Sequence, residues 1–273
     1  MQSIKLKILN AQGHTLLTCH EAEEVSLVYT HEYCSGDMIV LECGESDCFC
    51  VVQFEDTLAP AYIYVPQRVA AYKIPFAENR IVFSPKAFIG SRHLIRARLA
   101  RAGEISHRRN LAFNPYDQHG ENGFFPHTSA NVETRGEAVF ASYNAVDGIY
   151  QNASHGEWPY QSWGINRDPN AAWTLDFGRP VTVDEVRVTL RADFPHDSWW
   201  TQGTVDFSDG SSETLHFEKT DATQRFSIAT RTVTKLTLHS LIKADDPSPF
   251  PALSQFEAWG HEAAADEKSN LKI

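Results

Sequence analysis

Long apolar runs are missing from this sequence of 273 residues, and none approaches the roughly 18 residues that a membrane-spanning helix needs. The first residues, Met1 to Leu9, alternate apolar and polar side chains, which is typical of a strand and not of a basic-then-apolar secretory signal. We therefore expect no membrane insertion and a cytoplasmic location, or a secreted protein if a leader peptide precedes this sequence.

Motifs of catalysis are missing too. No serine lies in a nucleophile elbow, no glycine-rich loop is arranged to cradle phosphate, and no two histidines have the H-x-x-x-H spacing that binds zinc. Acid pairs that could hydrolyse a glycoside exist, for example Glu157 with Asp193 or Asp197, but any acidic β-protein contains such pairs. We favour a non-catalytic protein and keep a small glycosidase or sugar-modifying enzyme, with an acidic site between domains, as an alternative.

Basic residues are fewer than acidic ones, and the imbalance is uneven along the chain. The net charge is −11, and residues 1–105 hold 10 Lys and Arg against 12 Asp and Glu, so −9 belongs to the later residues. An acidic surface repels phosphate backbones and anionic lipid headgroups. We therefore expect neither nucleic acid nor a membrane as partner.

Cysteine is absent after residue 50. The five cysteines are Cys19, Cys34, Cys43, Cys48 and Cys50. An odd number without a secretory signal argues against a disulfide framework. The last three have C-x4-C-x-C spacing, unlike the paired C-x2-C of zinc ribbons, and Cys48 and Cys50 share one face of a strand. We expect reduced thiols in a core, and the spacing leaves open a metal site completed by Cys34 or His31.

Tryptophan is absent before residue 158, so the two halves of the chain differ in composition. Short alternating runs bounded by turn residues occur throughout, such as 4–8, 173–177 and 186–190, and no helical periodicity appears between 110 and 260. Residues 93–101 are compatible with a helix, but their alternation favours a strand. These patterns predict an all-β protein with a β-sandwich domain of unknown role at 1–105, a second one at 106–262, and a flexible tail at 263–273.

Four motifs of the second half occur in an order that is found in a known family. They are Asn110–Pro115, Ala145–Gly148, Ala172–Gly178 and Phe256–Gly260. In these motifs the chain resembles the discoidin superfamily, which includes the C-type domains of coagulation factors V and VIII, fucose-binding lectins and family 32 carbohydrate-binding modules. The resemblance implies a galactose-binding-like jelly roll over residues 106–262 whose loops bind sugars or lipid headgroups without catalysis.

Three loops of this half, at 150–163, 166–170 and 191–200, combine aromatic, charged and amide side chains. An aromatic ring packs on the apolar face of a pyranose, and charged planar groups exchange paired hydrogen bonds with its hydroxyls. Trp199 and Trp200 are adjacent, so one of them faces the core. We predict that carbohydrate binds at His155, Trp158, Tyr160, Arg191, Asp193, His196, Asp197, Trp199 and Trp200. A protein-interaction or homo-oligomer interface formed by the same aromatic loops is a further alternative.

The resemblance adds detail at two places. Fucose-binding lectins of this fold carry a histidine and an Arg-x-Asp, which His155 and Arg191-Ala192-Asp193 match, but Ser198 stands where those lectins have a further basic residue. This points to a related monosaccharide or glycan terminus. The family also holds a structural calcium ion, and the matching ligands here are Asn144 through its carbonyl, Asp147, Asn152 and Glu257.

Overall fold

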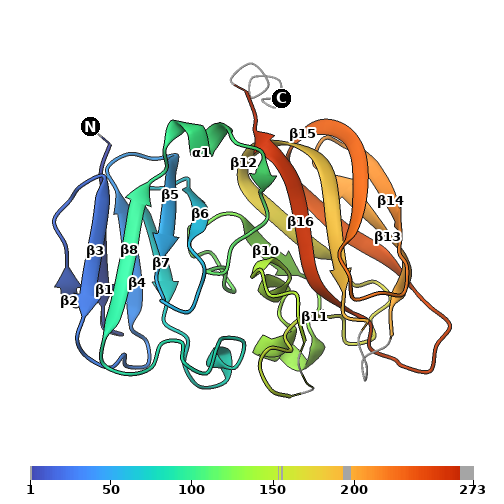
Figure 1. Ribbon diagram of the computed structural model, residues 1–273, viewed down its shortest axis with the longest axis horizontal. Coiled ribbons are helices and arrows are strands. Elements are labelled where there is room, and N and C mark those ends of the chain that lie inside the picture. The colour runs from blue at the N-terminus through green and yellow to red at the C-terminus, as the bar shows by residue number, and fades with distance from the viewer. Residues whose placement is uncertain (1, 153, 155, 193–197, 265–273) are drawn as a thin grey trace.

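The computed structural model describes residues 2–152, 154, 156–192 and 198–264, and it confirms an all-β protein with two sandwich-like units side by side (Figure 1). Within these residues the only α-helix is α1 (Ala102–Ser106), which lies between the two units in sequence. No helix of the described ranges is long and apolar enough to cross a membrane. The predicted tail lies mostly at 265–273, outside the described residues.

The first unit consists of two antiparallel four-stranded sheets. One has the order β2 (Thr15–Thr18), β1 (Ile4–Leu9), β4 (Met38–Cys43), β7 (Val69–Lys73). The other has the order β3 (Glu24–Tyr29), β8 (His93–Leu99), β5 (Cys48–Gln53), β6 (Ala61–Val65). Strict alternation of buried and less buried side chains along β1, β3 and β5 places one face of each sheet in a shared core.

Residues 93–101, which were compatible with a helix or a strand, contain strand β8, as predicted. Ile95 and Ala97 are buried while Arg96 between them is exposed, and the strand pairs antiparallel with β3 and β5. A helix would have placed Ile95 and Ala97 on different faces. The two-residue alternation therefore outweighed local helix propensity, because a sheet buries every second side chain.

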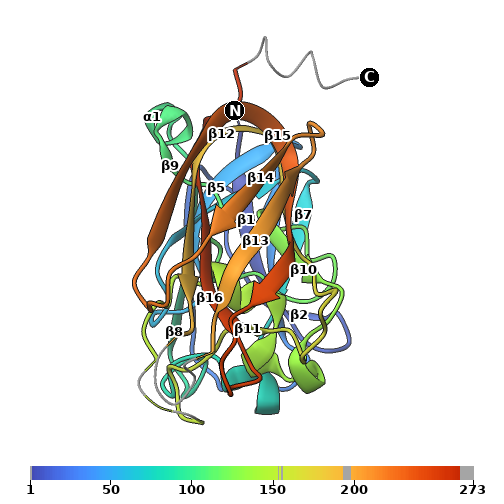
Figure 2. The same ribbon diagram turned by 90° about the vertical axis from the view of Figure 1, so that its right-hand side faces the viewer.

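The second unit is one eight-stranded antiparallel arrangement with the path β11-β16-β12-β15-β13-β14, to which β10 and β9 add at β12 and β16. Its strands are β9 (Arg109–Asn110), β10 (His127–Ala130), β11 (Trp163–Gly164), β12 (Trp173–Leu190), β13 (Trp200–Phe207), β14 (Ser212–His216), β15 (Gln224–Lys243) and β16 (Ala252–Glu262). The long strands β12 and β15 break register after Asp176 and after Val183 and curve over one end of the unit (Figures 1 and 2).

Gly260 on β16 illustrates how closely the strands cross at that curved end. A β-carbon at Gly260 would lie 1.9 Å from the carbonyl oxygen of Thr182 on β12. Only glycine permits this approach, which explains why the predicted motif ends on glycine.

Each unit has its own apolar core, and the segment that joins them contributes to both. Tyr116 and Phe124 are fully buried in the first core, whereas Leu111 and Ala112 pack in the second. The backbones of Tyr64 on β6 and Phe125 exchange two hydrogen bonds of 2.9 Å. The connecting segment is thus packed into the first sandwich, and it holds the two units together.

Candidate ligand-binding site

Four of the predicted ligand residues, His155, Asp193, His196 and Asp197, lie outside the described residues. Arg191 is described, at the end of β12, and it joins two of the predicted loops. Its guanidinium donates hydrogen bonds to the carbonyl of Tyr160 and, at 3.4 Å, to the carbonyl of Ser154. The loops at 150–163 and 191–200 therefore meet, as predicted. Because Arg191 is only 1% exposed, its role in the structure is to hold the first loop in place.

The predicted aromatic residues divide between core and surface. Trp200 is buried and its ring lies 6.3 Å from that of Trp163, while the adjacent Trp199 is half-buried. This is the division expected for neighbours on a strand. Tyr160 is also buried, and Trp158 is half-buried. Trp200 and Tyr160 thus support the loops from below and offer no exposed ring face.

Among the described residues, a pocket of about 150 Å³ opens beside Arg191. Its walls come from the 3-10 turns at 134–140 and the end of β11. Residues 166–167 of the loop predicted at 166–170 and residues 250–252, where β16 begins, complete them. The lining residues are Thr134, Arg135, Phe140, Ser162, Gly164, Ile165, Asn166, Arg167, Arg191, Phe250, Pro251 and Ala252. Each of the three predicted loops thus contributes to a single pocket, through Ser162, through Asn166 and Arg167, and through Arg191.

Aromatic faces and guanidinium groups dominate the rim of this pocket. Phe250 is 37% exposed, and the guanidinium carbon of Arg167 lies 4.4 Å from its ring centroid. On the other side Arg135 lies 5.4 Å from the ring centroid of Phe140 and forms an ion pair of 2.5 Å with Glu137. No ion pair of Arg167 occurs within the described ranges, and no carboxylate is among the lining residues. The rim therefore combines apolar rings with two guanidinium groups, of which Arg135 is paired with Glu137.

The pocket wall depends on close backbone packing. A β-carbon at Gly164 would lie 2.7 Å from Thr134 Oγ1, so glycine allows β11 to approach the turn at 134. The Thr134 hydroxyl accepts a hydrogen bond of 2.9 Å from the backbone N–H of Asn166. Asn166 and Arg167 both have positive φ, 50° and 63°, a strained region for residues other than glycine. A strained backbone persists only where the surrounding structure holds it, and such strain is frequent at binding sites.

One polar atom at the pocket has no partner within the described structure. The hydroxyl oxygen of Ser162 is buried and makes no hydrogen bond there. Leaving a buried hydroxyl unsatisfied costs about 1–3 kcal/mol.

Sequence reasoning missed the residues Arg135, Phe140 and Phe250. The segment Pro247-Ser-Pro-Phe-Pro251 carried a usable signal, since prolines on both sides of an aromatic ring keep it out of regular strands and near the surface. Arg135 carried none, because its place at the pocket depends on how the turns at 134–140 pack on β11.

The residues that the resemblance assigned to calcium are engaged with hydrogen-bond donors. The side-chain nitrogen of Gln255 on β16 lies 2.6 Å from Asp147 Oδ1, 2.9 Å from the Asn144 carbonyl and 3.3 Å from the Ile149 carbonyl. The second carboxylate oxygen of Asp147 accepts a hydrogen bond of 2.9 Å from Gln161. An amide nitrogen therefore stands where three loop oxygens converge, and the set as arranged does not fit a cation that needs six to eight oxygens.

Glu257 and Asn152 line a separate, open groove of about 520 Å³. Glu257 accepts hydrogen bonds from Tyr150, at 2.7 Å, and from the indole of Trp259, and it lies 3.7 Å from the guanidinium of Arg187. Asn152 donates at 3.5 Å to Ser254 Oγ. Both carboxylates of the predicted set are thus satisfied by protein donors, and calcium remains a prediction that this geometry does not support.

Comparisons with known proteins find similar structures but no sequence relatives. No family profile and no curated protein matches the chain. Among solved structures, the chain is similar to a chitosan-binding module of a chitosanase/glucanase from Paenibacillus sp. IK-5, with 19% identity over 56% of this chain and 99% of that chain and a TM-score of 0.40. It is also similar to a fucose binding module from Streptococcus pneumoniae, with 13% identity over 56% of this chain and 99% of that chain and a TM-score of 0.41.

A third similar structure is the family 32 carbohydrate-binding module of NanJ from C. perfringens, solved in complex with galactose. Its identity is 12%, it covers 48% of this chain and 91% of its own, and the TM-score is 0.37. These proteins are of the kinds that the four sequence motifs resemble. At these identities and TM-scores the likeness assigns no ligand, so any function has to be argued from this chain's own residues.

Proposed function

We propose that this protein binds a carbohydrate without transforming it, through the pocket between Arg135, Arg167 and Phe250, and that the preferred sugar carries an acidic group. The observation that carries the proposal is the pairing of exposed aromatic faces with guanidinium groups around one pocket. The apolar face of a pyranose would pack on Phe250.

The acidic group follows from the charges at the rim. Arg167 is exposed and has no ion pair among the described residues, whereas Arg135 is exposed and paired with Glu137, and no Asp or Glu lines the described part of the pocket. A guanidinium binds a carboxylate or sulfate through two parallel hydrogen bonds. On a chain with a net charge of −11, acidic ligands are repelled elsewhere on the surface, which would restrict them to this pocket.

Glycan-array binding tests the proposal. Wild-type protein should bind glycans that end in uronic, sialic or sulfated sugars, with Kd values of about millimolar to micromolar, or roughly −4 to −8 kcal/mol, so multivalent display will strengthen the signal. Phe250→Ala should reduce binding at least tenfold. Arg225→Ala is the matched control, because Arg225 lines the separate groove with Glu257 and should leave binding unchanged. Binding that is lost in the control and kept in Phe250→Ala would place the site in the other groove.

A further inference from the structure

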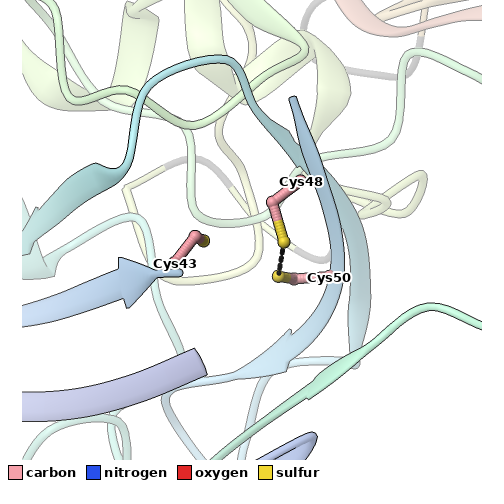
Figure 3. Close-up of side chains that lie close together, drawn as sticks. All are labelled: Cys43, Cys48 and Cys50. Atoms are coloured by element: carbon pink, nitrogen blue, oxygen red, sulfur yellow. Dashed lines mark hydrogen bonds between the residues drawn. The ribbon is translucent and has the colours of Figure 1, made fainter. Parts of the chain in front are cut away.

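The sulfur atoms of Cys43, Cys48 and Cys50 form a compact cluster inside the first sandwich. They lie within 4.8 Å of one another, and the sulfurs of Cys48 and Cys50 are 3.5 Å apart. Figure 3 shows the three side chains pointing into the space between β4 and β5. Cys48 and Cys50 are 0% exposed and Cys43 is buried.

The strands explain why these three thiols meet although they belong to two different sheets. Cys43 ends β4 in one sheet, and Cys48 begins β5 in the other, so the turn at 44–47 carries the chain across the core. Cys48 and Cys50 are two residues apart and therefore point to the same, inner face of β5. Asp47 with a φ of 57° makes the turn tight enough to place Cys43 opposite them.

We propose that these three cysteines form a binding site for a three-coordinate thiophilic ion, with trivalent arsenic as its representative. Three sulfurs that each bind one ion at about 2.3 Å are at most about 4.0 Å apart, and the sulfurs of Cys48 and Cys50, at 3.5 Å, already meet this limit. The observed cluster therefore needs only small side-chain movements to close around one central atom. Thiolate ligands select soft ions over hard ones.

The number of ligands and the net charge decide between soft ions. Within the described residues no histidine, aspartate or glutamate joins the cluster, so Zn²⁺ would lack the fourth protein ligand of its closed structural sites. Cu⁺ with three thiolates would leave two negative charges in an apolar core, where unpaired charge is costly. A trivalent ion with three thiolates is neutral. The surroundings of Cys43, Cys48 and Cys50 thus favour the trivalent ion.

Binding of arsenite is balanced without an oxidant or reductant. As(OH)3 meets three thiols; three As–S bonds form, three As–O bonds break, and each thiol proton leaves with a hydroxide as water. The product at Cys43, Cys48 and Cys50 carries no charge. Because the thiols are buried, the ion enters while the turn at 44–47 is open or while the chain folds.

Refolding with arsenite tests the site. The protein is refolded with arsenite and a monothiol-free phosphine reductant, passed through a desalting column, and its mass is measured intact. Wild type should retain one arsenic per chain, with the loss of three thiol hydrogens, and should melt at a higher temperature than the arsenic-free protein. Cys43→Ala and Cys48→Ala should each lower retention at least tenfold.

Matched controls separate the cluster from cysteine content in general. Cys19→Ala and Cys34→Ala remove thiols that lie outside the cluster, and both should retain arsenic fully. Should the cluster variants misfold, X-ray absorption on the wild-type complex still decides, because it counts the sulfur neighbours. Three sulfurs support the site. Two sulfurs with an oxygen, or no retained arsenic in wild type, overturn it, whatever the sugar pocket does.

Discussion

Asp147 has a carboxyl group in surroundings unusual for an acid. Its carboxyl group is buried and accepts hydrogen bonds from Gln161, Gln255 and the backbone of Ile149. Burial raises the pKa of Asp147 to about 7, and the three donors oppose this rise only in part. Burial therefore disfavours the charged form of Asp147 despite its three hydrogen-bond donors.

The raised pKa predicts how stability depends on pH. The folded pKa lies above the ordinary value of 3.8, so the contribution of Asp147 to stability is fully present below pH 4 and is lost as pH rises to about 7. Each pKa unit corresponds to about 1.4 kcal/mol, which gives a few kcal/mol in total. The melting temperature of wild type minus that of Asp147→Asn should therefore fall between pH 4 and pH 7.

Calcium and a chelator provide the control at this site. With Gln255 in place, neither added calcium nor EDTA should change the pH-dependent difference between wild type and Asp147→Asn. A difference that instead grows with pH, and does so only when calcium is present, would show that a cation and not Gln255 neutralises the carboxylate.

At the scale of the elements, the alternation of side chains allowed most strands to be predicted. β8 and the start of β12 follow from period-two patterns, because one buried face fixes which residues point inward. The pocket could be predicted only in part. Arg167 and Arg191 belong to predicted loops, whereas Phe250 and Arg135 reach the pocket through packing between segments more than 100 residues apart. Such long-range packing leaves no local pattern in the sequence.

The crossing of β16 over β12 yields a prediction of its own. In Gly260→Ala the new β-carbon would lie 1.9 Å from the Thr182 carbonyl, so the strands must separate. Overpacking of this kind costs about 1–3 kcal/mol or more. Urea unfolding should show a loss in this range or a failure to fold.

Gly103→Ala is the matched control for this crossing. Gly103 lies in α1, has open space around its α-carbon, and takes ordinary φ. Alanine favours a helix by about 1 kcal/mol over glycine, so this variant should be neutral or slightly stabilising. Equal losses for the two variants would mean that the strands do not approach so closely.

At the scale of the whole molecule, the two sandwiches are joined by a buried ionic cluster as well as by the connecting chain. Glu262 on β16 is 7% exposed and accepts hydrogen bonds from Arg179, at 2.7 and 2.8 Å, and from Arg109, at 2.5 Å. Arg109 in turn stacks 3.9 Å from the ring centroid of Tyr62 in the first sandwich. The single carboxylate of Glu262 therefore pairs with both guanidinium groups at the junction.

Removal of this acid should destabilise the protein strongly. Glu262→Ala leaves two buried guanidinium groups without an acid, and breaking such a cluster costs about 3–5 kcal/mol. Asp184→Ala removes the partner of Arg108 in a more exposed ion pair, which contributes about 0–1 kcal/mol. Chemical denaturation of both variants measures the contrast, and similar losses would show that the junction is not held by this cluster.

The most direct test of the sugar pocket compares two versions of one glycan that differ only in an acidic terminal sugar, glucuronic acid, and its neutral counterpart, glucose. Titration calorimetry should show that wild type binds the acidic version at least tenfold more tightly, and that Arg167→Ala removes the preference. Equal affinity of wild type for both glycans, or a preference that survives Arg167→Ala unchanged, would contradict the assignment of this pocket to an acidic carbohydrate.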